Sequence, residues 1–257
     1  MDEQTRPGRL AVGLALLTGA IAAGVILVAY SPDDDAPKAS VGERVPATMG
    51  PVPTNKVDGL GNATIRLNGN RATVTLKTKG LLDEAPHVMH IHAGEEGACP
   101  TPAAARLHNG KLSISTLDGA AFYGSPRVSL TTRGDIGVVS ILEFARYPST
   151  GSFTYKRTIK LRPRTLRFIR RNLAAIVVHG IDYNGNGVYD DTLGGSDLNP
   201  ALQGEATAPA LCGELLVGRA EQESARGPGP GGVRVYTSSL GLPPAAGSLI
   251  CHLQRTT

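Results

Sequence analysis

The sequence predicts an all-β domain, folded as an antiparallel sandwich or barrel, behind an N-terminal membrane-spanning segment. Three observations support this prediction. Gly (32) and Pro (18) make up roughly a fifth of the 257 residues, which favours short elements joined by turns over long helices. From residue 58 onward, β-branched apolar segments are short and are separated by Gly, Pro and Asp. A long apolar run occupies residues 10–30.

The run at residues 10–30 is uncharged. At ~1.5 Å per residue, a helix of this length crosses the ~30 Å hydrocarbon core of a bilayer. Arg6 and Arg9 precede the run and aspartates at 33–35 follow it, so the positive-inside rule places residues 1–9 in the cytoplasm. We therefore expect a single-pass cell-membrane protein with an extracytoplasmic C-terminal domain. In a second interpretation the run is a cleaved signal peptide and the protein is secreted, although such signals usually hold only ~7–15 apolar residues.

The exported part divides into three segments. Residues 31–57 are rich in Pro, Ala and charge, show no sustained periodicity, and are predicted to be a linker. Residues 58–217 carry the predicted strands and are expected to form the folded domain. Residues 218–257 include EQESARGPGPGG and are predicted to be a low-complexity tail without a fixed fold.

The predicted strands follow from alternation and turn signals. Apolar residues alternate on both sides of Asn68-Gly69 in ATIRLNGNRATVTLK, which is a strong hairpin signal. A short helix is expected at residues 164–171, before a strand. The further strand candidates are residues 87–93, 111–116, 136–143, 152–161, 173–181 and 209–217.

The stretch HVMHIHAG, residues 87–94, holds three of the six histidines of the chain. Residues two apart on a strand face the same side, so His90 and His92 project together and the residues between and before them face a core. His87 shares the core-facing side and is expected to be structural. An H-x-H motif on a strand can supply two imidazole ligands to a transition metal, and neutral imidazole suits copper and zinc. In the alternative, the pair is exposed and binds no metal.

A third histidine follows the apolar run AAIVV at residues 174–178, which is predicted to be a buried strand. His179 ends this strand. A histidine in such a position is more often a hydrogen-bonded structural residue than a ligand. It becomes a candidate ligand only if the fold places it beside His90 and His92.

The three cysteines are Cys99, Cys212 and Cys251. Thiols outside the cytoplasm tend to pair, and export is expected in both interpretations of the N-terminus. An odd number predicts one disulfide and one leftover thiol.

Together, these motifs resemble the Cu/Zn superoxide dismutase family. HVMHIHAG is similar to that family's H-x-x-H-x-H strand, and VVHGIDYNGNG is similar to its later strand ending V-V-H. ALCG at residues 210–213 is similar to its C-terminal A-C-G, and the order of these features agrees over residues 81–217. The chain also resembles exported bacterial proteins with a chordin-type (CHRD) domain, an extracellular β-module with a similar H-I-H strand.

The resemblance implies a superoxide dismutase-like Greek-key β-sandwich in which His90, His92 and His179 are copper ligands. It also implies a disulfide between Cys99 and Cys212, because the family's C-terminal cysteine bridges to one shortly after the first histidine cluster. The third cysteine is then the leftover thiol. Copper held by three imidazoles keeps an open position for a small anion such as superoxide, so the implied activity is dismutation.

Departures from the family pattern predict a copper-only site. His108, nine residues after Cys99, is the remaining candidate for the family's bridging histidine and is either a further copper ligand or a loop residue. No histidine lies between positions 108 and 179, so a zinc site is not expected. Pro209 stands where the family has an arginine that guides the anion. The eight Lys and Arg residues of 156–171 either replace that arginine or form a solvated basic face.

A second ion site is suggested by DYNGNGVYDD, residues 182–191. Position 12 of a calcium-binding loop would be Leu193 here instead of an acidic residue. The stretch is therefore either an isolated oxygen-lined calcium loop or an Asx- and Gly-rich turn that needs no metal. The residues at loop positions 1, 3, 5 and 9 are Asp182, Asn184, Asn186 and Asp190.

The modest net charge of +4, without aromatics among the basic residues, does not favour a nucleic-acid partner.

Three functional hypotheses follow. The first hypothesis is a membrane-held copper domain with dismutase-like oxidoreductase activity. The second is a non-enzymatic extracellular CHRD-type module that binds a metal or a partner without turnover. The third is copper storage or delivery, with Cys251 and His252 as the transfer group.

Overall fold

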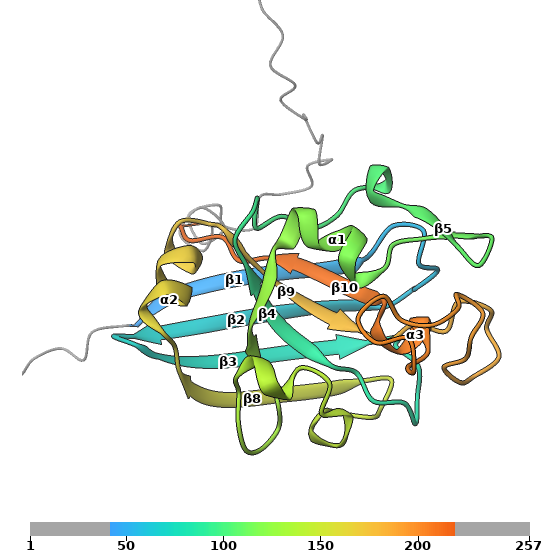
Figure 1. Cartoon of the computed structure of the whole chain (residues 1–257). Coiled ribbons are helices and arrows are strands. Elements are labelled where there is room, and N and C mark those ends of the chain that lie inside the picture. The colour runs from blue at the N-terminus through green and yellow to red at the C-terminus, as the bar shows by residue number, and fades with distance from the viewer. Residues whose placement is uncertain (1–41, 219–257) are drawn as a thin grey trace, which may run out of the picture. The chain divides into compact units, whose positions relative to one another are not determined.

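The computed structural model describes residues 42–218, which form a mostly β structure with few helices (Figure 1). Eight strands form one curled antiparallel sheet in the order β7-β4-β9-β10-β1-β2-β3-β8, and β5 pairs with β6 in a separate hairpin. The strands are β1 (Glu43–Pro51), β2 (Leu60–Asn68), β3 (Arg71–Lys79), β4 (Met89–Ala93), β5 (Arg106–His108), β6 (Lys111–Ser113), β7 (Ser125–Ser129), β8 (Phe153–Lys160), β9 (Ala174–His179) and β10 (Pro209–Glu214). The helices are α1 (Thr116–Tyr123), α2 (Pro163–Arg170) and α3 (Gly204–Thr207).

One hydrophobic core joins the two ends of the sheet. Strands β1, β2 and β3 bury alternate side chains, and β8 buries Tyr155 and Ile159 on the same face, as expected for a sheet with one face toward water. Their buried side chains, such as Ile65 and Val74, belong to the same cluster as Ile91 of β4 and Ile176 of β9. Since β4 and β8 lie far apart in the strand order, the sheet must curl to enclose this core.

Strand β9 is buried on both faces. Ile176 and Val178 point into the main core, whereas Ala175 and Val177 join a second cluster that contains Tyr123 of α1. This double burial explains why the sequence of β9 is apolar without alternation. It also leaves a covered space on the outer face of β4 and β9, beside α1.

Most strand predictions are confirmed. The Asn68-Gly69 hairpin joins β2 and β3, with Asn68 opposite Arg71 and Gly69 at a φ of 59°. The elements β4, β8, β9, β10 and α2 lie at the positions predicted as residues 87–93, 152–161, 173–181, 209–217 and 164–171.

Two other strand predictions need correction. Residues 136–143 contain a 3-10 turn, Val138–Ser140, in which Val139 is 80% exposed, so this β-branched run is not a strand. Residues 111–116 hold only the short β6, because Ser115 caps helix α1. The hydroxyl of Ser115 accepts from the backbone N–H of Asp118, and the Asp118 carboxylate accepts from the Ser115 N–H, which is a capping box.

The predicted linker 31–57 is also wrong in part, because it contains β1, and the domain begins before residue 58. The alternation of Val45, Ala47 and Met49 is present, and all three are buried. Prolines in the same stretch conceal it. At Pro46, β1 pairs with β2 alone and meets β10 only at its last two residues, so a missing N–H is tolerated there.

Among residues 42–218, no helix is long and apolar enough to cross a membrane. The predicted span 10–30, the residues before it and the tail from 219 onward lie outside the described residues. The all-β class is thus confirmed as a curled antiparallel sheet, and the membrane anchor stays a prediction.

Candidate metal centre

Strand β4 places His90 and His92 on the sheet face that points away from the main core. His90 lies opposite Val177 and His92 opposite Ala175 on β9, and both partners belong to the second cluster beside α1. The sequence prediction that the two imidazoles share a face is therefore confirmed. Both side chains are almost fully buried, at 4% and 1% exposure.

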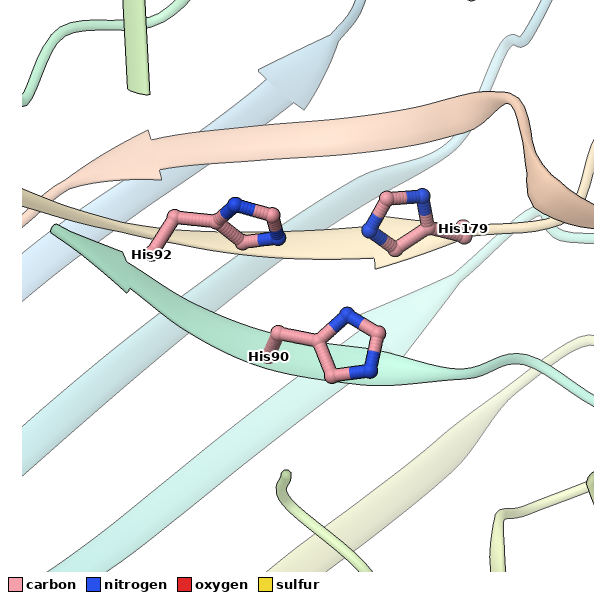
Figure 2. A group of neighbouring side chains, drawn as sticks. All are labelled: His90, His92 and His179. Carbon is pink, nitrogen blue, oxygen red and sulfur yellow. The ribbon is translucent and has the colours of Figure 1, made fainter. Parts of the chain in front are cut away.

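His179 reaches the same place through the pairing of β9 with β4. Its backbone N–H donates to the carbonyl of Val88 at 2.9 Å. The ring centroid of His179 lies 5.1 Å from that of His90 and 5.7 Å from that of His92, and the latter two are 5.5 Å apart. The three rings point toward one another (Figure 2), and one nitrogen from each lies within 4.8 Å of the others. Together they could hold one metal ion.

Each imidazole is oriented by a backbone carbonyl from a separate segment. A carbonyl only accepts, so the ring nitrogen that faces it carries the hydrogen and the other nitrogen keeps its lone pair. The metal-facing atoms are therefore Nδ1 of His90 and Nε2 of His92 and His179. The three contacts are His90 Nε2 to Ile141 at 3.1 Å, His92 Nδ1 to Gly124 at 2.9 Å, and His179 Nδ1 to Thr207 at 2.7 Å.

Two of these metal-facing atoms are buried without a hydrogen-bond partner. They are Nε2 of His92 and Nε2 of His179. Buried polar atoms are nearly always paired, and each unpaired one costs about 1–3 kcal/mol. A metal ion between the rings would satisfy both atoms, so the residues fit such an ion.

Burial also keeps the three rings neutral. It lowers the pKa of His92 to about 3, with repulsion from His179 as a second cause, and lowers the pKa of His179 to about 4. Burial, together with repulsion from the other two rings, holds the pKa of His90 well below its ordinary value. Neutral imidazole is the form that binds a metal, so the site is in its ligating state at neutral pH.

A cavity of about 120 Å³ is lined in part by His90, His92 and His179. Helix α1 forms one wall, through Thr116, Leu117, Ala120 and Tyr123. The edge of the Tyr123 ring meets the His92 ring, with their centroids 4.6 Å apart. A small molecule in this cavity would lie beside an ion held by the three histidines.

Tyr147 supports the remaining ring. Its hydroxyl donates to the carbonyl of Ser140 at 2.8 Å and lies 3.4 Å from Nε2 of His90. Burial raises the pKa of Tyr147 to about 12, so the phenol stays protonated. Sequence reasoning assigned no role to this tyrosine or to the three carbonyls, because backbone acceptors leave no mark in a sequence.

Cys99 and Cys212 form a disulfide, as the family resemblance implied. It joins the loop after β4 to strand β10, across 113 positions of the chain. Cys212 packs in the second hydrophobic cluster with Tyr123 and Val177. The bridge therefore fastens the covered side of the sheet, where the histidines lie.

His108 lies outside the three-histidine group. It is on β5, partly exposed, and its Nε2 is 2.6 Å from the carboxylate of Asp118. Asp118 also completes the capping box of α1. This geometry supports the interpretation of His108 as a residue that fastens the β5–β6 hairpin to α1.

The proposed calcium loop is a hydrogen-bonded turn. The carboxylate of Asp182 accepts from the backbone N–H groups of residues 185, 186 and 187. Asp190 accepts from the side-chain amides of Asn184 and Asn186. The buried Glu205, which sequence reasoning missed, accepts from the N–H groups of residues 183 and 190 and fastens the loop to α3. Calcium binding here stays a prediction.

The basic stretch 156–171 does not reach the metal centre. It forms most of β8 and all of α2, and none of its residues lines the cavity. Pro209, which the resemblance aligns with an arginine that guides the anion, lies opposite His179 in the pairing of β10 with β9. A replacement for that arginine is therefore absent from the described cavity wall.

Comparisons with protein-family models and with curated proteins gave no match. The resemblance to the Cu/Zn superoxide dismutase family and to CHRD proteins therefore stays a prediction based on motifs.

Proposed function

We propose that this chain is an exported copper-binding domain, held at the cell membrane by residues 10–30, with His90, His92 and His179 as the copper ligands. The observation that carries the proposal is the convergence of three neutral imidazoles, two of which have a buried nitrogen without a hydrogen-bond partner. Divalent copper binds nitrogen sites more tightly than zinc and the other first-row metals do, and imidazole is among its preferred ligands. Within the part of the chain that the structure describes, this group of candidate ligands consists of the three histidines and includes no carboxylate or thiol.

Superoxide dismutation is the activity that the family resemblance implies for this site. Copper would supply one-electron redox chemistry, which zinc lacks. The chain's own residues fix the rings through three carbonyls, keep them neutral by burial, and leave a cavity beside them. The order of the motifs and the Cys99–Cys212 disulfide support this proposal.

A non-enzymatic CHRD-type module is the second candidate. The observation that favours it is the cavity wall, which carries no charged side chain to attract an anion. The proline at residue 209, where the resembling family has an arginine that guides the anion, also favours this module. Such a module would bind copper or a partner without turnover.

Copper titration of the full-length chain in detergent tests the copper proposal. We expect one equivalent to bind, with nitrogen hyperfine structure in the electron paramagnetic resonance spectrum. His92→Ala and His179→Ala should each weaken binding by at least about 100-fold, because loss of an outer partner alone typically costs 10–100-fold. His108→Ala is the matched control and should bind as the wild type does. Equal binding by all variants would contradict the assignment.

Superoxide consumption by the copper-loaded chain separates the two candidates. If the chain is an enzyme, it should consume superoxide faster than a soluble copper–imidazole complex does. This activity should be lost in His92→Ala. A rate no higher than that of the complex would support the non-enzymatic module.

Membrane attachment is checked independently, because an anchored chain stays in the membrane pellet after alkaline washing.

A further inference from the structure

The cavity above the three histidines has apolar walls. None of the side chains that line it carries a charge. The apolar side chains in its walls include Val88, Leu117, Ala120, Pro126, Leu142 and Leu198.

Three of the four hydroxyls that line the cavity, those of Thr116, Tyr123 and Thr207, are engaged in hydrogen bonds. The hydroxyl of Thr116 donates to the carbonyl of Thr207 at 2.6 Å. The hydroxyl of Tyr123 donates to the carbonyl of Thr116 at 2.8 Å, and that of Thr207 donates to Ser196 at 2.7 Å. Few polar groups of the wall are therefore free, and Nε2 of His92 and Nε2 of His179 are buried without a hydrogen-bond partner.

Two leucines mark the opening of the cavity to solvent. Leu117 and Leu198 both line it, and they are 56% and 39% exposed. A ligand that enters must pass these apolar side chains. An ion that does so loses much of its hydration without meeting a charged side chain, which is costly.

We propose that the open position takes a neutral, largely apolar small molecule that carries one nitrogen or oxygen donor atom, in preference to a small anion. This inference rests on the proposed copper site, because the donor atom binds the histidine-held metal. It favours the non-enzymatic module over dismutation, because superoxide is a small anion. The apolar body of the ligand fills the space under α1. A dry cavity of ~150 Å³ accommodates benzene, so a volume of about 120 Å³ matches a single small ring.

Ligand titration of the copper-loaded full-length chain tests the preference, with the copper spectrum as the readout. The probes are pyridine, 4-methylpyridine and azide. We expect 4-methylpyridine to bind about fourfold more tightly than pyridine after correction for donor strength with a copper–imidazole complex, because one more buried methyl group is gained. Azide should bind no more tightly than it binds that complex.

Two variants examine the walls. Ala120→Leu fills the cavity and should weaken both pyridines by about 5-fold or more, with copper still bound. Leu198→Arg places a cation at the opening and should strengthen azide binding about two- to fivefold. Leu107→Arg is the matched control, because Leu107 is 72% exposed on β5 and does not line the cavity. A stronger preference for azide than the free complex shows, unchanged by Ala120→Leu, would overturn the inference.

A metal-free measurement separates this inference from the copper proposal. Toluene added to the metal-free chain should shift the methyl resonances of Leu117 and Leu198 in a saturable way, and Ala120→Leu should abolish the shift. Saturable binding together with failure to hold copper would leave the apolar ligand pocket standing and overturn the copper proposal. Absence of saturable binding, with one equivalent of copper retained, would overturn the pocket and leave the copper proposal intact.

Discussion

Nδ1 of His179 lies 2.7 Å from the carbonyl oxygen of Thr207, the last residue of α3. The segment that leaves β9 after His179 thus returns, 28 residues later, to orient the ring at its own start. The hydroxyl of Thr207 is itself held by Ser196. The orientation of each of the three rings therefore depends on backbone outside its own strand as well as on the strand itself.

Gly124→Ala should weaken copper binding without touching a ligand. Gly124 has a φ of 78°, and an added Cβ would lie 2.8 Å from the backbone of Ala93. The shift that relieves this clash moves the carbonyl that orients His92. Loss of such a partner typically costs 10–100-fold in metal affinity. Competition with a copper chelator measures the change.

Gly110→Ala is the control for that substitution. Gly110 has a similar φ of 73°, but nothing lies within 4 Å of its added Cβ. Both variants place an alanine at positive φ. At Gly110 the strain is of order 1 kcal/mol, and at Gly124, whose ψ is −168°, it is about 1–3 kcal/mol. Only the first should lose copper affinity, and equal losses would show that backbone strain alone explains the effect.

Acid should destabilise the metal-free protein through the buried histidines. The pKa of His92 is about 3 in the folded state, against an ordinary value of 6.5. Between these values the unfolded chain binds a proton that the folded chain does not, so stability falls as pH decreases from about 6.5 toward 3. From pH 7 to pH 5 this ring alone should remove about 2 kcal/mol.

Urea unfolding at both pH values measures that loss. His92→Asn removes the titrating ring and keeps an amide that can donate to Gly124. The free energy of unfolding of this variant should fall by about 2 kcal/mol less than that of the wild type over the same interval. Parallel pH dependences in the two proteins would contradict the assigned burial.

The disulfide should contribute strongly to stability. Cys99 and Cys212 are 113 positions apart, and closing so long a loop in the unfolded chain is worth up to about 5 kcal/mol. Cys99→Ser should therefore lower the free energy of unfolding by about 2–5 kcal/mol in urea titrations. Cys251→Ser leaves the bridge intact and is expected to unfold as the wild type does. Loss of stability in the second variant alone would contradict this pairing.

Much of the fold could be predicted from alternation and turn residues. The hairpin at Asn68-Gly69 and the buried strand β9 were readable because each has a single dominant pattern. Strand β1 was missed because prolines interrupt the same alternation that buries Val45 and Met49. The run containing Val138 and Val139 was predicted to be a strand because it is β-branched. It forms a 3-10 turn, since it has no partner strand.

The candidate site was readable only in part. The shared face of His90 and His92 follows from strand geometry, but their meeting with His179 depends on the pairing of β4 with β9, which no local pattern encodes. The family resemblance supplied that pairing in advance. The orienting carbonyls and the apolar cavity wall were not predictable, because they arise from short helices and turns whose positions depend on tertiary packing.

X-ray absorption spectroscopy of the chain loaded with one equivalent of copper tests the central claim most directly. The account predicts a copper ion with three imidazole nitrogens at about 2.0 Å, a distance typical of imidazole bound to a metal of this size. His92→Asn should reduce the imidazole count to two, and His108→Asn should leave it at three. A spectrum that requires sulfur or mainly oxygen ligands, or that is unchanged in His92→Asn, would contradict it.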